Sequence, residues 1–222
     1  MNELVVSAHP DDETLGCGAT ILRRIAEGHS VHWAIVTRAH SPAWAEDVVE
    51  AKSREIDAVA SAYGMAGVHR LGFPSMRLDT IPRAELMQAL RAVVQDVRPE
   101  VVYVTHPGDA HEEHEIVFES VTAVLRAFRM RDLGVRRVFV YETLSSTDAA
   151  PALAERAFVP QLLVDVSEFL ERKLEIMALY ETEAQPDPMP RGPSAIRALA
   201  RTRGASIGVE YAEAFVVARE LA

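Results

Sequence analysis

The chain has 222 residues, with a hydrophobic fraction of 49%, a charged fraction of 25% and a formal net charge of −10, as is typical of one globular domain. The acidic balance, without any block of basic residues, argues against nucleic acid as a partner. No apolar run reaches the roughly 18 residues of a membrane helix, and the short apolar start lacks the form of a secretory signal, so we expect a cytoplasmic protein without membrane contact.

β-Type runs alternate with helical patterns through the first two thirds of the chain. Strands are expected at 3–8, 31–37, 68–71, 101–104 and 137–141, and helices at 14–27, 44–63, 82–97 and from about residue 114. Gly28 and Gly64 end the first two helices, and Pro82 stands at the first turn of the third. These βα units predict a three-layer, doubly wound, mostly parallel α/β sheet of the Rossmann-like class.

The last third of the chain is less regular. A strand is expected at 162–164, a helix from Ser167 to about residue 180, a helix at 194–203 and a strand at 214–217. Four prolines between residues 186 and 193 predict a loop, either a rigid spacer or a lid near the functional site. No linker divides the chain, so residues 1–222 are expected to form a single domain.

A dense polar segment follows the first expected strand. It holds one imidazole and three carboxylates, at His9, Asp11, Asp12 and Glu13. A neutral imidazole and a carboxylate are ordinary Zn²⁺ ligands, and a spare carboxylate beside a metal can take a proton from water. Because Cys17 is the only cysteine, a metal site here must use histidine and carboxylate. Taken alone, the segment is also compatible with a solvated loop and a helix N-cap.

A second polar cluster follows the strand that ends near Thr105. Residues 106–114 contain three of the eight histidines, and a helix beginning here would place His111 and His114 on one face. In the simplest doubly wound order, 3-2-1-4-5, the strands that precede the two clusters are neighbours at the point where the winding reverses. The topology therefore predicts that both clusters border one crevice and form one site.

The two clusters together resemble the motifs of the PIG-L or LmbE-like family of zinc-dependent N-deacetylases. The residues concerned are Ala8-His9-Pro10-Asp11-Asp12-Glu13 and His111-Glu112-Glu113-His114, with supporting similarity in Arg54-Glu55, Arg203-Gly204 and Gly208-Val209-Glu210-Tyr211-Ala212-Glu213. The resemblance implies that His9, Asp12 and His114 bind one Zn²⁺ per chain, or another divalent metal. It also implies that Asp11 is the general base and that His111 stands beside the substrate.

Elementary chemistry agrees with these roles. Three protein ligands leave a fourth position for water, as catalytic zinc requires. Asp11 can complete the deprotonation of that water, and a protonated His111 can stabilise the oxyanion that follows. Either residue can supply the proton that the departing amine needs. Glu113 occupies a position where relatives commonly have aspartate, and it is expected to orient His111 from behind.

The resemblance implies a small-molecule substrate of the N-acetylglucosamine type and leaves its aglycone open. Arg54 matches a sugar-contacting position, and the alternative is an exposed arginine on an amphipathic helix. Arg137 matches an arginine near the catalytic base of some relatives. A tyrosine that some relatives place near the oxyanion is absent here: Asp109 occupies one such position, and a backbone amide or Arg191 is the expected substitute.

Two other functions remain open from the sequence. One is an amidase that cleaves a larger amide of a sugar conjugate, and the other is a non-catalytic sugar-binding protein of the same fold. Trp44 and Met76 are candidates for lining a pocket, although single apolar residues of this kind usually belong to the core. Because related proteins are often oligomeric, we also expect a homo-oligomer.

Overall fold

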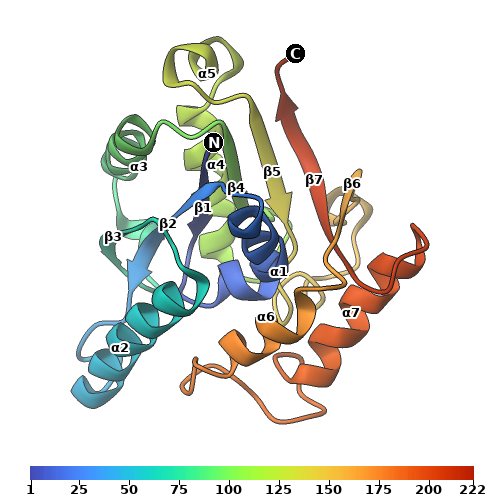
Figure 1. The fold of residues 1–222 in the computed structure, drawn as a ribbon. Helices are drawn as coiled ribbons and strands as arrows, with labels where there is room; N and C mark the ends of the chain where they lie inside the picture. The colour runs from blue at the N-terminus through green and yellow to red at the C-terminus, as the bar shows by residue number, and fades with distance from the viewer.

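A seven-stranded sheet organises the computed structural model, which describes residues 1–222 (Figure 1). The strand order is β3-β2-β1-β4-β5-β7-β6. The strands are β1 Asn2–Ser7, β2 Ser30–Arg38, β3 Gly67–Pro74, β4 Val101–Thr105, β5 Arg137–Tyr141, β6 Leu162–Asp165 and β7 Ala212–Glu220. The first five strands are parallel in the predicted order 3-2-1-4-5, whereas β7 runs antiparallel to both β5 and β6.

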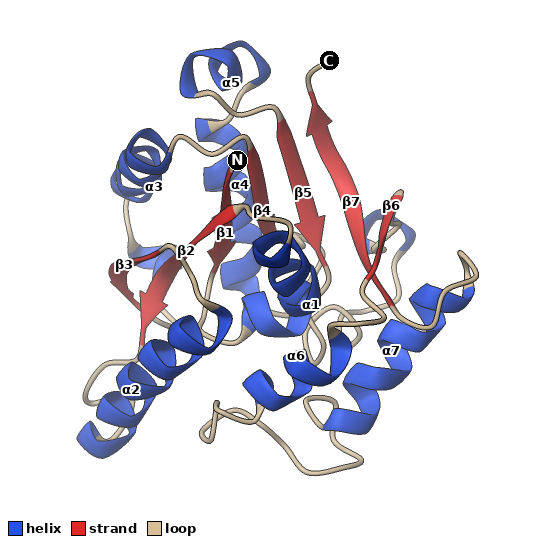
Figure 2. Ribbon diagram, viewed as in Figure 1, coloured by secondary structure: helices blue, strands red, loops and turns tan.

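Helices cover both faces of this sheet (Figure 2). They are α1 Asp12–Ala26, α2 Glu46–Tyr63, α3 Arg83–Val97, α4 Glu112–Val124, α5 Ala127–Leu133, α6 Leu170–Met177 and α7 Pro193–Ala205, with short 3-10 turns at Leu78–Thr80 and Ala154–Arg156. The prediction of a single-domain, three-layer α/β fold is confirmed. Helix α5 was not predicted, and no helix has the combination of length and apolar character that crossing a bilayer demands.

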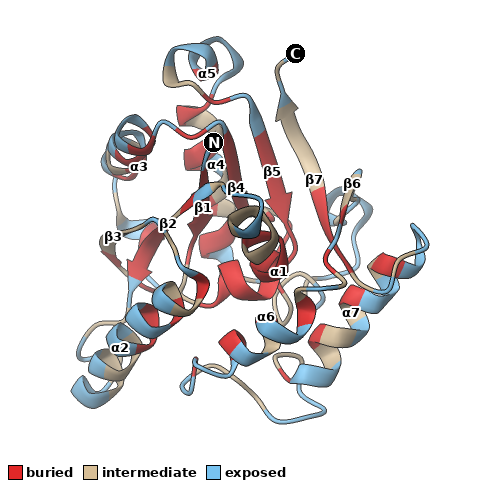
Figure 3. Ribbon diagram, in the orientation of Figure 1, coloured by how far each residue is buried: buried red, intermediate tan, exposed pale blue.

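The layers arise from the alternation of side chains along buried strands. In β1, Leu4 and Val6 face a core shared with α3 and α4, whereas Val5 faces a second core shared with α1, α2 and α6. Strand β4 is buried along its whole length and is apolar except for Thr105, as parallel central strands generally are. Figure 3 shows the result, with buried strands at the centre and exposed outer surfaces on α2, α3 and α5.

The fold brings the two polar clusters together. Strands β1 and β4 pair directly, with Val6 opposite Val104. The chain leaves β1 toward His9 and leaves β4 toward His111, so both clusters emerge at the carboxyl edge of the sheet. The convergence that the strand order predicted is therefore present.

Candidate metal and catalytic site

Three residues from the two clusters form a compact polar corner. His9 follows β1, Asp12 opens α1 and His114 lies in the first turn of α4. His114 Nε2 lies 3.2 Å from Asp12 Oδ1, and His9 Nδ1 lies 3.7 Å from Asp12 Oδ2. Ring nitrogens of His9, His111 and His114 also lie within 4.8 Å of one another. Ligand atoms about 2.0–2.1 Å from a tetrahedral Zn²⁺ are about 3.3–3.4 Å apart, so this donor set fits such an ion.

Carboxylates hold both imidazoles from behind. The Nδ1–H of His114 donates to Asp109 Oδ2 at 2.6 Å, and the Nε2–H of His9 donates to Glu113 Oε2 at 2.7 Å. In each ring this leaves the other nitrogen free toward Asp12, as in the carboxylate–histidine pairs that support metal sites. Burial alone would lower the pKa of His114, but Asp12 and Asp109 raise it to about 10, so the corner favours a cation.

The expected role of Glu113 needs correction. Its carboxylate orients His9 and also accepts the backbone N–H groups of Arg77 and Leu78, and it makes no hydrogen bond to the His111 ring. His111 instead caps α4, because its Nδ1 accepts the backbone N–H of Glu113 at 3.3 Å. Although burial opposes it, the hydrogen bond from His9 holds the pKa of Glu113 at about 2.

The N-cap hydrogen bond also determines the tautomer of the His111 ring. Because Nδ1 accepts a hydrogen bond, the proton of the neutral ring sits on Nε2. Burial and the neighbouring His9 and His114 lower the pKa of His111 to about 4, so the ring is neutral near pH 7. The lowered pKa and the N-cap hydrogen bond favour a neutral ring that donates from Nε2 over the protonated His111 expected from the sequence.

Asp11 occupies an unusual backbone conformation. Its φ of 110° lies in the left-handed region, which costs a non-glycine residue of the order of 1–3 kcal/mol. Buried Glu13 supports it by accepting the N–H of Asp11 at 3.2 Å, and Tyr180 donates its hydroxyl proton to the same carboxylate. Burial raises the pKa of Glu13 to about 7. Burial and the adjacent Asp12 also raise the pKa of Asp11.

The arginine beside Asp11 is Arg191 and not Arg137. Arg191 Nη1 donates to Asp11 Oδ2 at 3.1 Å from the proline-rich loop 186–193, which places this loop at the site. Arg137 begins β5, pairs with Glu220 at 2.9 Å and is exposed. Since the site lies where the parallel strands end, a residue that opens β5 belongs to the opposite edge of the sheet.

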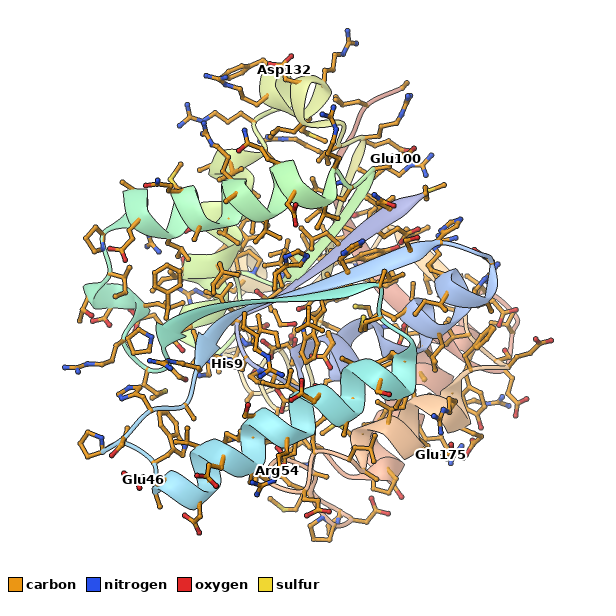
Figure 4. The ribbon with its side chains drawn as sticks, turned by 60° about the vertical axis from the view of Figure 1, so that its left-hand side comes forward. His9, Glu46, Arg54, Glu100, Asp132 and Glu175 are labelled. Carbon is orange, nitrogen blue, oxygen red and sulfur yellow. The ribbon has the colours of Figure 1, made fainter.

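Arg54 does not line the cavity. The exposed fraction of its side chain is 71%, and Figure 4 shows it on the side of α2 turned away from His9. Lys52 lies on the cavity side of the same helix. The helical period explains this correction, because Lys52 is four residues before the buried Ile56, whereas Arg54 is only two before it.

The polar corner opens into a cavity of about 580 Å³. Trp44 and Met76 line it, so the less favoured of the two sequence interpretations, pocket and not core, is the one that the structure bears out. Thr143, in the loop after β5, also lines the cavity. Thr143 was missed from the sequence, because no spacing links it to either cluster. Its Oγ1 is buried and has no hydrogen-bond partner in the structure.

Comparison with known proteins gives the following matches. The family PIG-L, described as GlcNAc-PI de-N-acetylase, matches residues 4–125, more than half of the chain. A 1D-myo-inositol 2-acetamido-2-deoxy-alpha-D-glucopyranoside deacetylase of Saccharomonospora viridis is 28% identical, over 97% of this chain and 94% of its own length. The deacetylase of the same name from Rhodococcus opacus is 32% identical over 60% of this chain, and the match spans only 56% of that protein.

A solved structure extends the agreement over the whole fold. The conserved protein TT1542 from Thermus thermophilus is 30% identical, with a TM-score of 0.77, covering 99% of this chain and 96% of that one. The family match includes both polar clusters, from His9 to His114. The chain therefore belongs to the PIG-L family of de-N-acetylases.

Proposed function

We propose that this protein is a metal-dependent hydrolase that removes the acetyl group from an N-acetylglucosamine-type sugar or its conjugate. In this proposal His9, Asp12 and His114 hold one Zn²⁺ or another divalent ion. The observation that carries the proposal is the corner in which His114 Nε2 and Asp12 Oδ1 lie 3.2 Å apart while a carboxylate orients each imidazole from behind. The named activity of the curated relatives supports the same reaction.

A divalent ion bound at this corner would supply a Lewis acid that polarises a carbonyl and lowers the pKa of water. Asp11 then serves as the general base. It is buried beside Asp12, and burial raises its pKa, which brings a carboxyl closer to the value that a base needs at neutral pH. The contact from Arg191 to Oδ2 holds the carboxylate in place. The strained backbone of Asp11 fits a position that function constrains.

His111 is the proposed donor to the oxyanion. Its Nδ1 is held by the N-cap hydrogen bond, so Nε2–H is the donor that remains for the cavity it lines. A single donor of this kind is worth about 10²–10³ in turnover in other acyl-transfer sites. The departing amine takes its proton from Asp11, once that group is protonated, because the neutral His111 would have to become an imidazolate to supply it. A small amino-sugar derivative is the proposed partner, and we keep the homo-oligomer as a prediction that light scattering tests.

The proposal is tested by metal content and acetate release on one sample. We expect about one divalent ion per chain and acetate release from N-acetylglucosamine derivatives that stops on chelation and returns with metal. The Asp11→Asn variant should lose roughly 10²–10⁴ in kcat while keeping its metal. Glu112→Gln removes an exposed carboxylate from the same segment and serves as the control.

Two results would contradict this proposal. Normal turnover by Asp11→Asn would exclude the assigned base. Release of a larger acid in place of acetate, from a substrate that carries both, would favour the amidase.

A further inference from the structure

The cavity wall beyond the metal corner carries a cluster of cationic side chains. Lys52, Arg38 and Arg70 line it from α2, β2 and β3, and Arg191 lines it from the proline-rich loop. These four cations line one cavity although the chain as a whole has a formal net charge of −10. The partners of each cation decide which of these charges is available to a ligand.

Three of these four cations are neutralised within the protein. Lys52 pairs with Glu183, and Arg191 pairs with Asp11 and the same glutamate. Arg70 Nη2 lies 2.6 Å from Asp57 Oδ1, and its Nη1 donates to the hydroxyl of Ser53. Their charges are therefore used in ion pairs that hold α2, β3 and the proline-rich loop in place around the cavity.

Arg38 is the exception. It is exposed at the end of β2, and its guanidinium has neither a carboxylate partner nor a hydrogen bond in the structure. Its backbone is held, since the carbonyl of Arg38 accepts the N–H of Ser75 at 3.0 Å. Gly72, with a φ of +75°, also lines the cavity, and a Cβ there would lie 3.9 Å from Arg38 Cδ, so the arginine stem runs beside this glycine.

The position of Arg38 relates it to the proposed reaction. Strands β1 and β2 are paired neighbours, about 4.8 Å apart. His9 follows β1 and Arg38 ends β2, so both residues line the same cavity, with the arginine stem beside Gly72 of β3. A sugar whose acetamide group lies at the corner can direct another of its substituents toward this wall.

We infer that the substrate carries an anionic substituent, a carboxylate or a phosphate, and that Arg38 binds it. The inference rests on the proposed deacetylation and names the class of molecule that the same cavity takes. Guanidinium offers paired donors that suit both anions. Because Arg38 is neither a proposed metal ligand nor a proposed proton-transfer group, we expect it to act on binding and to change KM more than kcat.

The experiment compares sugars that differ in one neutral or anionic substituent. Acetate release is measured for the methyl and 2-hydroxyethyl glycosides of N-acetylglucosamine, for its carboxymethyl glycoside and for its 1- and 6-phosphates. The wild-type protein should prefer at least one anionic sugar by roughly tenfold in kcat/KM, as one charge-assisted contact allows, and added salt should reduce this preference. The carboxylate and phosphate arms identify the source of the charge.

Variants assign the preference to one side chain. Arg38→Gln should reduce the ratio of anionic to neutral kcat/KM by about the same factor, mainly through KM. Arg54→Gln, which removes an equal charge from the outer side of α2, should leave the ratio unchanged. An equal loss in both variants, or no preference in the wild-type protein, would overturn the inference.

A binding measurement separates this inference from the proposed function. Calorimetry of the deacetylated products, glucosamine and its phosphates, should show the same charge preference and its loss in Arg38→Gln. If no sugar releases acetate but this preference is present, the proposed function fails and the anion site stands. If acetate is released and binding is independent of charge, the anion site fails and the proposed function stands.

Discussion

Asp109→Asn tests how the site prepares its histidine. Asp109 is buried, and its Oδ2 accepts the Nδ1–H of His114 at 2.6 Å while its Oδ1 accepts the hydroxyl proton of Thr147 at 2.6 Å. The hydroxyl of Thr147 in turn accepts the N–H of Thr143. One carboxylate thus orients a proposed metal ligand and holds the loop that lines the cavity. Asparagine keeps the shape and one acceptor oxygen but removes the charge.

The expected effect of this change is on metal affinity. Loss of such a supporting group typically weakens metal binding by about 10–100-fold, or about 1.4–2.7 kcal/mol. We expect a shift of this size in competition with a chromophoric chelator, with kcat of the fully loaded protein less affected. Glu113→Gln, which changes the carboxylate behind His9, should give a shift of similar size. Unchanged affinity in both variants would refute the role of Asp109 and Glu113 in supporting the proposed metal ligands.

Two further predictions concern stability and the opposite edge of the sheet. Lys173→Met should destabilise the fold by about 3–5 kcal/mol, measured by urea unfolding, because it leaves the carboxylate of Glu213 buried without the Lys173 Nζ that lies 2.7 Å away. Arg172→Met, at an exposed neighbouring position, should change stability by less than about 0.5 kcal/mol, and equal losses would argue against the buried pair. Arg137→Gln should leave kcat within about twofold, as for surface changes remote from a site; a large loss would contradict its placement away from the site.

The true positions of Arg54 and Arg137 could have been predicted from the sequence. Lys52, Ile56, Val59 and Tyr63 follow the spacing of one helix face, so the period of α2 distinguishes Lys52 from Arg54. The direction of a parallel strand likewise places Arg137 at the edge opposite the site. In both cases the helical period or the strand direction predicts the position of the side chain better than similarity to a family position does.

Other contacts had no signal in the sequence. Arg191 reaches Asp11 across 180 positions of the chain, and Glu113 reaches His9 across 104. Such pairs depend on how a loop and a helix are placed over the sheet, and one sequence carries no periodicity that reports it. The contact of Asp109 with His114 also had no sequence signal, because it depends on the path of the turn between β4 and α4.

The sequence by itself determined the order of the five parallel strands and the meeting of two polar clusters at one edge of the sheet. It did so because apolar runs specify buried parallel strands, and the winding of such strands brings their carboxyl ends together. Only the tertiary structure decided which carboxylate supports which histidine, which arginine contacts Asp11 and which cavity cation is free. Those features depend on side-chain directions and distances between distant segments, which hydrophobic patterning leaves unspecified.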